Sequence, residues 1–558
     1  MWTIHPTLLS VAALPAASAL MGWALLLLAV AWSLRREPEK FTGYDRWGWW
    51  ILLAGAMAAF RWPLITLPHE IYPDESQLLS GALTLRHDPV FWRSVDGGTA
   101  GPLDYYILLP AAFFPGATAY AVTRLIATLV IWGMLVAAGE SLTLITSRAA
   151  ARVAVLPAAA IAALTTSPEF IHYSTELVPG LLLALAGLMI VRQSVQDSRG
   201  NLWAAALLLG ATPFAKLQAA PIAAFLGLLL MVLEITSGRS RQVGLLIVVA
   251  LLPTLLVAVL VTATGQAEHM LIPYFLQNLH YAEIGRLPFP DVVRQLGAQS
   301  ATNGYHVLWL AGCGVFCTGV VLLARNTPGR LWRHGLAMVM LLAVTLFCIL
   351  SPGRPYHHYL NLLTLPVTLL AGLVLAVALQ PRTSGTNPRP GFVLGAFLLC
   401  TLVPQLVLRV SPRPDPYEYY NTTVVVRGPA HDELIAALKR LSSPGEPLGL
   451  WGWRSSLYIE AGLPQATREA HTTFQLIAGP WQKYYLRRYY EDLVAATPPV
   501  FADTAGSGHF WFTNRASGHE VFPLLSDWLR TNYAYVGEWD GVRLYARLDR
   551  MPTARRGD

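Results

Sequence analysis

Long apolar segments alternate with short polar ones along most of this chain. Runs of roughly the 17 to 25 residues that a bilayer requires lie near 10–34, 47–67, 119–142, 150–166, 176–192, 202–215, 217–235, 243–263, 302–324, 334–351, 358–379 and 391–410. The pattern predicts about twelve membrane-spanning helices. The first run is predicted to remain as a helix, because residues 1–10 lack the Lys or Arg of a signal peptide.

Composition agrees with a polytopic membrane protein. Hydrophobic residues make up 54% of the 558 positions, charged residues only 13%, and the mean hydropathy is +0.45. The net charge of +7 comes from arginines scattered over short loops, so it indicates topology and no nucleic-acid partner. All four cysteines fall inside apolar segments, which excludes a disulfide framework and a CxxC metal site.

The loops sort into two kinds by charge. Those at 35–46, 143–152, 192–201, 236–242, 325–334 and 380–390 are short and rich in Lys and Arg, so they are predicted to face the cytoplasm. The alternate loops at 68–118, 167–175, 216, 264–301 and 352–357 are poorer in basic residues and are predicted to face outward, together with the tail. We therefore expect an integral protein of the bacterial inner membrane with an extracytoplasmic C-terminal region.

After residue 410 the character of the chain changes. Ser411 to Pro416 is a proline-rich linker, and the region beyond it alternates helical and strand patterns, with a closing hairpin over 533–547. We predict a transmembrane domain over 1–410, with a catalytic outer loop at 68–118, and a soluble α/β domain over 411–558. Most of the many aromatic residues of the tail are predicted to pack in its core or to dock on the membrane surface, and stacking on sugar rings is the alternative.

Unusual polar motifs concentrate in the predicted outer loops. They are Tyr72-Pro73-Asp74-Glu75, the stretch from Ser167 to Glu176, Lys216 in a gap between two apolar runs, the loop from His269 to Arg294, and Gly353 to Tyr359 with His357 and His358. Arg124 lies a few residues inside the third span. Ionisable residues beside lipid are costly to desolvate, so a functional role is expected for them.

Each motif also has a structural interpretation. Asp74 and Glu75 fit a solvated turn at Pro73, and Lys216 fits an anchor that reaches the headgroups. Glu176 fits a helix cap, Arg124 an interfacial arginine, and the histidine pair an aromatic belt. Considered singly, none of the motifs decides between the two interpretations.

Considered together, the motifs place carboxylates and cations on one face of a helix bundle. Arg and Lys suit a phosphate at headgroup level, and a carboxylate suits deprotonation of an incoming hydroxyl. This combination predicts transfer of a sugar from a polyprenyl phosphate carrier to an acceptor. A lipid-linked donor also fits the absence of a phosphate loop and the short cytoplasmic loops.

The order of these motifs resembles that of GT-C membrane glycosyltransferases, in particular the bacterial branch similar to protein O-mannosyltransferases and lipid A aminoarabinose transferases. The resemblance runs from about Trp47 to Arg409. It rests on Tyr72-Pro73-Asp74-Glu75, Gly101-Pro102-Leu103, Thr123-Arg124-Leu125, His172 to Glu176, Lys216-Leu217-Gln218 and His357-His358-Tyr359. The family's interfacial helix would correspond to 102–116, for which a short re-entrant packing helix is the alternative.

The resemblance implies a role for each motif. Asp74 would be the base, assisted by Glu75 and Glu176, and Asp74 with Glu176 would hold any divalent cation, Mg²⁺ or Mn²⁺. The donor phosphate would be held by Arg124 and Lys216, with Arg354, His357 and His358 beside them. Many relatives carry Asp where this chain has Glu176, so the need for a metal stays open. The stereochemical outcome, the sugar and the acceptor, whether glycan, lipid or protein, also stay open.

Two other classes of function remain. A transporter or flippase of a lipid-linked substrate would require ionisable residues near the middle of spans or paired interrupted helices, and the middles of these runs hold almost none. A scaffold in an envelope assembly would leave the outer charges far apart.

Overall fold

The computed structural model describes residues 15–35, 43–165, 167–303, 329–379, 390–402, 428–507 and 512–551. The chain divides into two compact units, and each unit is assembled from distant parts of the sequence. Unit 1 comprises Met1–Ile65, Arg124–Val257 and Gly285–Tyr417, and unit 2 comprises Thr66–Thr123, Ala258–Ile284 and Glu418–Asp558. The C-terminal region therefore shares a unit with the first predicted outer loop. The linker from Ser411 to Pro416 lies outside the described residues.

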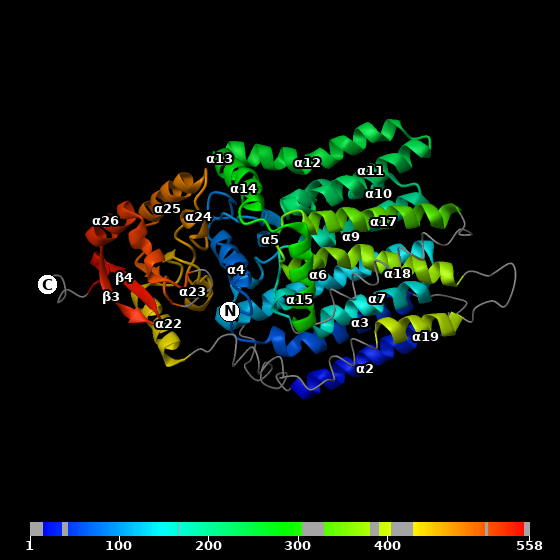
Figure 1. Cartoon of the computed structure of the whole chain (residues 1–558), viewed down its shortest axis with the longest axis horizontal. Helices are drawn as coiled ribbons and strands as arrows, with labels where there is room; N and C mark the ends of the chain where they lie inside the picture. The colour runs from blue at the N-terminus through cyan, green and yellow to red at the C-terminus, as the bar shows by residue number, and fades with distance from the viewer. Residues whose placement is uncertain are drawn as a thin grey trace. The chain divides into compact units, whose positions relative to one another are not determined.

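Unit 1 is a bundle of helices. In chain order they are α2 (Pro15–Leu34), α3 (Gly43–Ile65), α6 (Gly116–Ile145), α7 (Arg148–Leu164), α8 (Pro168–Ile171), α9 (Leu177–Val195), α10 (Arg199–Ala211), α11 (Ala220–Thr236), α12 (Arg241–Ala263), α15 (Phe289–Asn303), α17 (Gly329–Leu350), α18 (Thr364–Ala378) and α19 (Pro390–Thr401). The first turns of α6 and the last turns of α12 belong to unit 2. Helices α7, α9, α10, α11, α17 and α18 run side by side (Figure 1), and the short 3-10 turns η2 (Thr212–Phe214), η3 (Leu217–Ala219) and η5 (His357–Leu363) join some of them.

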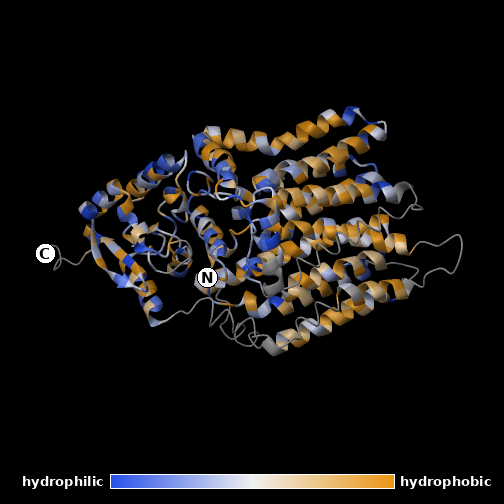
Figure 2. Ribbon diagram, in the orientation of Figure 1, coloured by the Kyte–Doolittle hydropathy of each residue, from blue (hydrophilic) through white to orange (hydrophobic). Residues whose placement is uncertain are grey.

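Eight helices of the described chain are long and apolar enough to cross a membrane, as judged by length and composition. They match eight of the predicted spans, and Figure 2 shows hydrophobic residues along their lengths. Of the other four predictions, 150–166 corresponds to the 17-residue α7 and 202–215 to the 13-residue α10. The span at 302–324 lies almost wholly outside the described residues, and that at 391–410 lies partly outside. The chain is an integral membrane protein, and the number of twelve spans stays a prediction.

The two ends of the unit 1 bundle carry different side chains. At one end, arginines of the short loops pair with nearby acceptors: Arg239 lies 3.4 Å from Asp197, and Arg152 donates to the carbonyl of Asp45 at 2.8 Å. At the other end lie the loop before α9, the turns around Lys216 and η5, which contact one another. The charge pattern of the sequence thus sorted these loops to the correct ends of this bundle.

Unit 2 surrounds a small mixed sheet. Its helices are α4 (Pro73–Leu85), α5 (Pro102–Tyr106), α13 (Ala267–Met270), α14 (Gln277–Glu283), α22 (Pro429–Leu441), α23 (Ser456–Ala461), α24 (Thr473–Leu476), α25 (Gln482–Ala496) and α26 (Pro523–Asn532). The strands are β1 (Leu448–Trp451), β2 (Val500–Asp503), β3 (Tyr533–Trp539) and β4 (Val542–Arg547), in the order β1-β2-β4-β3. β1 and β2 are parallel, and the other pairs are antiparallel. The elements predicted for the tail are present.

The predicted closing hairpin is formed by β3 and β4. Asp540 and Gly541 join the strands, and both have positive φ, 49° and 72°. A two-residue turn of this type matches the twist of the flanking strands, and Asp-Gly adopts it readily. The local sequence therefore fixes the hairpin register, which pairs Trp539 with Val542.

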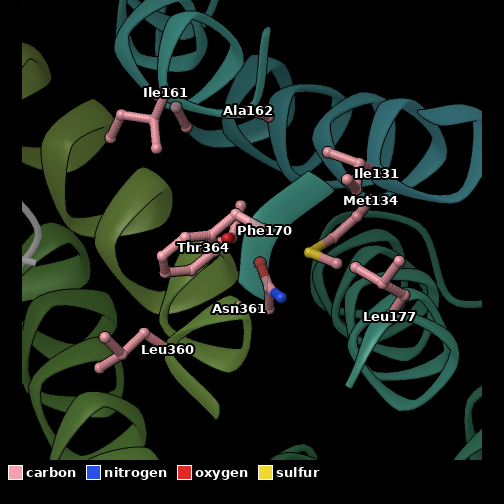
Figure 3. Close-up of a pocket in the computed structure, with 10 residues that line it drawn as sticks. Ile131, Met134, Ile161, Ala162, Phe170, Leu177, Leu360, Asn361 and Thr364 are labelled. Atoms are coloured by element: carbon pink, nitrogen blue, oxygen red, sulfur yellow. The ribbon is translucent and has the colours of Figure 1, made fainter. Parts of the chain in front are cut away.

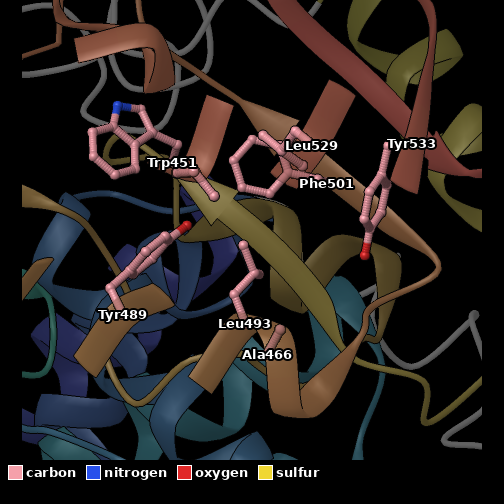
Figure 4. Close-up of a cluster of buried hydrophobic side chains, with 8 residues drawn as sticks. Trp451, Ala466, Tyr489, Leu493, Phe501, Leu529 and Tyr533 are labelled. Carbon is pink, nitrogen blue, oxygen red and sulfur yellow. The ribbon is translucent and has the colours of Figure 1, made fainter. Parts of the chain in front are cut away.

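Aromatic residues fill the core of unit 2 (Figure 4). Trp451, Tyr489, Phe501 and Tyr533 are buried in one cluster with Leu493, Leu525 and Leu529. Their polar atoms are satisfied, since Tyr489 donates to the carbonyl of Leu450 at 2.7 Å and Trp451 to that of Ser517 at 2.9 Å. For these aromatic residues, core packing is confirmed.

The acidic helix α4 is attached to the C-terminal region within unit 2. It packs against α23, and the side-chain amide of Gln465 bonds the hydroxyl of Ser80 at 2.8 Å. The backbone N–H of Gln465 donates to Thr84 Oγ1 at 3.0 Å. The tail thus supports the helix that carries Asp74.

A buried arginine ties the first outer loop to the same region. Arg488 of α25 pairs with Asp96 and donates to Glu469 Oε1 at 2.7 Å, and its guanidinium lies over the rings of Tyr484 and Tyr485. Burial raises the pKa of Glu469 to about 7, although Arg488 opposes the shift. Deep burial of several charges in one cluster demands such pairing.

The segment predicted as one interfacial helix over 102–116 is instead two short pieces. They are α5 and the 3-10 turn η1 (Ala111–Phe113). Pro110 stands between them and has no N–H for a helical hydrogen bond, which accounts for the interruption.

Candidate functional site

The clearest functional pair in unit 1 is Glu176 with Lys216. Lys216 lies between η2 and η3 in extended backbone, with φ −153° and ψ 126°, which directs its side chain toward the loop before α9. Its ammonium contacts Glu176 Oε1, donates to Thr175 Oγ1 at 2.5 Å, and lies 4.9 Å from the centroid of the Tyr359 ring. Three motifs that are far apart in sequence therefore converge on one cation.

Glu176 is only partly satisfied by this pairing. Its side chain is fully buried, and Oε2 has no hydrogen-bond partner among the described residues. Burial would raise the pKa of Glu176, but the charges of Lys216 and His358 hold it below its ordinary value. Glu176 occupies the N-cap position of α9 without a side-chain capping bond. A buried, ionised carboxylate with one open oxygen is suited to accept a proton donor.

A second pair, Glu169 with His358, lies beside the first. Glu169 is on the short helix α8, and its Oε2 contacts Nδ1 of His358 and accepts the backbone N–H of His358 at 3.3 Å. Burial would raise the pKa of Glu169, but His358 outweighs it and lowers the pKa to about 2. The ring of His172 lies 6.1 Å from that of His358. Both carboxylates at this end are thus ionised and paired with a cationic side chain.

Two other predicted phosphate ligands are His357, which begins η5, and Arg354, which lies three residues before it. The His357 ring stacks near Phe170 with centroids 6.5 Å apart, and its buried Nε2 has no hydrogen-bond partner among the described residues. Arg354 is half-buried and lies beside Gly285, where an added Cβ would be 3.4 Å from Nη1.

Arg124 is completely buried and donates to the carbonyl of Leu64 at 3.1 Å. This bond ties α6 to the C-terminal end of α3, where a cation is favourable for the helix dipole. Arg124 therefore has a structural role in addition to its predicted role as a ligand of the donor phosphate.

Sequence reasoning missed Arg61. This arginine is buried in α3 and donates to the carbonyls of Ala162 at 2.8 Å and Ile171 at 2.7 Å, with Phe170 at 3.4 Å. It therefore fixes the ends of α7 and α8 and so positions Glu169. The only signal in the sequence was an arginine inside an apolar run.

A small cavity is lined by Phe170 and Leu177, the residues that follow Glu169 and Glu176 in sequence (Figure 3). It has a volume of about 30 Å³ and is lined mostly by apolar side chains of α6, α7 and α9, with Asn361 and Thr364 as polar members. Asn361 donates to Ser174 Oγ at 3.2 Å. The space suffices for one or two water molecules.

Asp74 and Glu75 lie in the first turn of α4 in unit 2. Pro73 begins the helix, and Glu75 Oε2 accepts the backbone N–H of Ile71 at 3.2 Å. A glutamate that reaches back from the first turn caps a helix, so the buried Glu75 has a structural role. Asp74 is half-buried at the same helix end, where the dipole favours its charge.

A group missed by sequence reasoning lies beside these acids. Ser76 donates to Glu70 Oε2 at 2.5 Å, and its hydroxyl is 2.7 Å from that of Tyr120. All three side chains are buried. Ser76 and Tyr120 lie among apolar residues, and no periodic pattern in the sequence predicts that their hydroxyl groups meet.

Only one cluster of metal-ligand residue types is found in the described part of the chain, and it was not predicted. It consists of Asp503, His519 and Glu520 in unit 2. Arg543 contacts Asp503 and donates to Glu520 Oε1 at 2.5 Å, and His519 Nδ1 lies 2.6 Å from Asp503. The arginine supplies the positive charge that an ion would bring. The predicted metal role of Asp74 and Glu176 stays a prediction.

The structure therefore brings Glu176, Lys216 and His358 together in unit 1, with Glu169 as an additional member. Asp74 and Glu75 begin one helix of unit 2. Their common action with Glu176 and Lys216 stays a prediction.

No family model matches the chain, and no curated protein matches it. Among solved structures, ArnT from Cupriavidus metallidurans in the apo state is similar, with 12% identity, a TM-score of 0.39, and coverage of 89% of this chain and 97% of that one. The Archaeoglobus fulgidus oligosaccharyltransferase is similar in its apo form, with 12% identity, a TM-score of 0.42, and coverage of 84% and 71%. The same enzyme tethered to an acceptor peptide has 12% identity, a TM-score of 0.41, and coverage of 95% and 74%.

These proteins are membrane glycosyltransferases of the GT-C type, the class that the sequence motifs resemble. TM-scores below 0.5 assign no residue and no substrate to this chain. Its function is therefore inferred from its own contacts.

Proposed function

We propose that this protein is a glycosyltransferase that moves a sugar from a polyprenyl phosphate carrier to an acceptor at the extracytoplasmic face of the membrane. The observation that carries the proposal is the meeting of Glu176 and Lys216 at the end of the unit 1 bundle opposite its arginine-rich loops. A lysine held at a membrane face by one carboxylate oxygen is suited to bind a lipid phosphate.

The proposed reaction needs one base and one group of cations. Asp74 takes the proton of the acceptor hydroxyl, the acceptor oxygen forms a bond to the anomeric carbon, and the bond from that carbon to the phosphate oxygen breaks. The polyprenyl phosphate leaves with the bonding electrons, and Lys216 and Arg124 stabilise its charge, with Arg354, His357 and His358 as further proposed ligands of the phosphate.

The open oxygen of Glu176 supports a role beside the phosphate. Lys216 already pairs with Glu176, so a phosphate would compete with Glu176 for the ammonium. Glu176 would then need another donor, and a sugar hydroxyl is one. If a divalent cation takes part, Mg²⁺ or Mn²⁺, then Asp74 and Glu176 are the proposed ligands, since carboxylates suit both ions.

The positions of charges disfavour the transporter alternative. In the eight described spans, ionisable side chains lie near the ends, as Arg61, Arg124 and Glu140 do, and the central parts carry none. A substrate pathway through a bundle usually requires such groups at mid-depth. The contact of Lys216 with Glu176 likewise disfavours a scaffold whose outer charges lie apart.

The direct test incubates the purified protein with a panel of polyprenyl phosphate sugars and measures release of the free lipid phosphate. We expect turnover with at least one donor, and Asp74→Asn is expected to abolish it while expression and unfolding temperature stay normal. Asp88→Asn is the matched control, because Asp88 pairs with Arg93 at a partly exposed position of the same loop. Near-normal turnover by Asp74→Asn would rule out Asp74 as the base, and inertness toward every donor would favour the transporter.

Glu75→Gln separates capping from chemistry. Glutamine keeps an oxygen that can accept the N–H of Ile71, so we expect a nearly unchanged unfolding temperature and largely retained activity if Glu75 only caps the helix. Complete loss of turnover in a stable Glu75→Gln protein would instead assign Glu75 to the reaction.

A further inference from the structure

A short helical segment of unit 2 follows directly after the membrane helix α12. It runs from Ala267 to Glu283 through α13, the π turn η4 (Leu271–Leu276) and α14. We refer to it as the α13–α14 segment. Only Thr264, Gly265 and Gln266 separate it from the last residue of α12.

One face of the α13–α14 segment is docked inside unit 2. Tyr274 is buried and its ring lies 5.9 Å from that of Trp92. Asn278 donates to the carbonyl of Gly98 at 3.2 Å, and His269 Nδ1 is 2.7 Å from the hydroxyl of Tyr484. The segment thus holds the first outer loop and the C-terminal region.

Other side chains of the segment are large, apolar and at least partly exposed. Leu271 is 50% exposed and Leu279 is 66% exposed, and Phe275 between them is half-buried. The three residues are spaced by four. One turn of a π-helix contains more residues than one turn of an α-helix. The π turn over Leu271–Leu276 therefore helps to keep residues that are four positions apart on the same face of the segment. The local geometry therefore lines up a stripe of large apolar side chains.

Chain continuity indicates what covers this stripe. Helix α12 is the most apolar of the eight candidate spans, with a mean hydropathy of 2.9, and only 6% of it is buried. The three connecting residues reach at most about 11 Å, so the segment begins close to the end of a membrane helix. Amphipathic helices at this level bury their apolar face about 5–10 Å into the boundary between headgroups and acyl chains.

We propose that Leu271, Phe275 and Leu279 insert into the outer leaflet beside α12 and that the bilayer is the partner of this face. The contacts of Tyr274, Asn278 and His269 then fix the height of unit 2 at the lipid surface. This inference is independent of the proposed glycosyl transfer, since it needs only that α12 spans the membrane.

The test uses spin labels on the full-length protein in nanodiscs of phosphatidylcholine and phosphatidylglycerol. The four native cysteines are replaced, and single cysteines are introduced as Leu279→Cys, Leu271→Cys and, for control, Glu268→Cys, which is an exposed polar position of the same segment. Leu256→Cys on the exposed side of α12 is the reference for lipid contact.

We expect labels at Leu279 and Leu271 to collide more with oxygen than with a water-soluble nickel chelate, as at Leu256, and the label at Glu268 to show the reverse. Preferential access of the chelate to both stripe positions would overturn the proposal. Protection from both reagents would also overturn it, because another protein surface would then cover the stripe. The two stripe positions are labelled separately, so a folding defect in one variant leaves the other as a test.

Discussion

Two groups of buried charges, one in each unit, differ in how completely their hydrogen bonds are used. In unit 2, Asp503 accepts from the backbone N–H groups of Ala505 at 3.0 Å and His519 at 3.2 Å, and it also pairs with the His519 ring and Arg543. In unit 1, Glu176 uses one oxygen for Lys216, and the other has no partner among the described residues.

The difference separates a structural cluster from a candidate site. The group around Asp503 has the residue types of a metal centre, but its arginine already pairs with both carboxylates. The pair of Glu176 and Lys216 is less conspicuous, yet it retains one buried acceptor at the end of a membrane bundle. Unused hydrogen-bonding capacity is therefore a better guide to a ligand here than residue type.

The largest expected effect comes from Lys216→Met. This change leaves the Glu176 carboxylate buried without its cation, which costs about 3–5 kcal/mol of stability. We expect a marked fall in the unfolding temperature in detergent and no measurable release of polyprenyl phosphate.

The double variant Lys216→Met with Glu176→Gln distinguishes folding from function. It removes both charges, so stability should return toward the wild-type value, while transfer should stay absent because the phosphate ligand is missing. Wild-type turnover by a stable double variant would show that Lys216 serves only the fold.

The sequence predicted eight apolar spans that the structure also has, because such spans depend on local composition. It also predicted the hairpin over 533–547 and the helices and strands around it. It missed the composition of unit 2, since the bond from Gln465 to Ser80 joins positions 385 residues apart. No local pattern marks such a contact.

The sequence predicted which residues belong to the candidate site. It did not predict which of them form ion pairs or hydrogen bonds with one another. Glu169 was treated as part of a loop motif, although it bonds His358 189 residues away. Arg61 was missed because its partners are backbone carbonyls, which every residue carries. Topology assigns residues to a face of the bundle, and only packing decides which of them touch.

A smaller effect is expected from Arg543→Met in the cluster around Asp503. Loss of the arginine should lower stability by about 3 kcal/mol and leave transfer per folded molecule unchanged. Because Asp503, His519 and Glu520 then lose their cation, Zn²⁺ should raise the unfolding temperature of Arg543→Met but not that of the wild-type protein.

The same measurement with a chelator is the control. Treatment of the wild-type protein with EDTA should leave its unfolding temperature unchanged. A clear decrease would mean that an ion, and not Arg543, holds the cluster together.

The smallest effect is a pH dependence of opposite sign in the two units. The pKa of Glu169 in unit 1 is lowered to about 2 from 4.5, so its contribution to stability is present above pH 4.5 and is lost as the pH falls toward 2. The pKa of Glu469 in unit 2 is raised to about 7 from 4.5, chiefly by burial, with Asp492 and Asp96 acting in the same direction and Arg488 against it. Its contribution is therefore present below pH 4.5 and is lost as the pH rises through 7.

Unfolding temperatures between pH 5.5 and 8 isolate the second group, because Glu169 stays ionised throughout that range. We expect the wild-type protein to lose stability by a few kcal/mol at most toward pH 8, and Glu469→Gln to flatten the curve while it keeps an acceptor for Arg488. Glu169→Gln should leave the slope between pH 5.5 and 8 as it is. An unchanged slope in Glu469→Gln would mean that Glu469 binds no more protons in the folded than in the unfolded protein over this pH range.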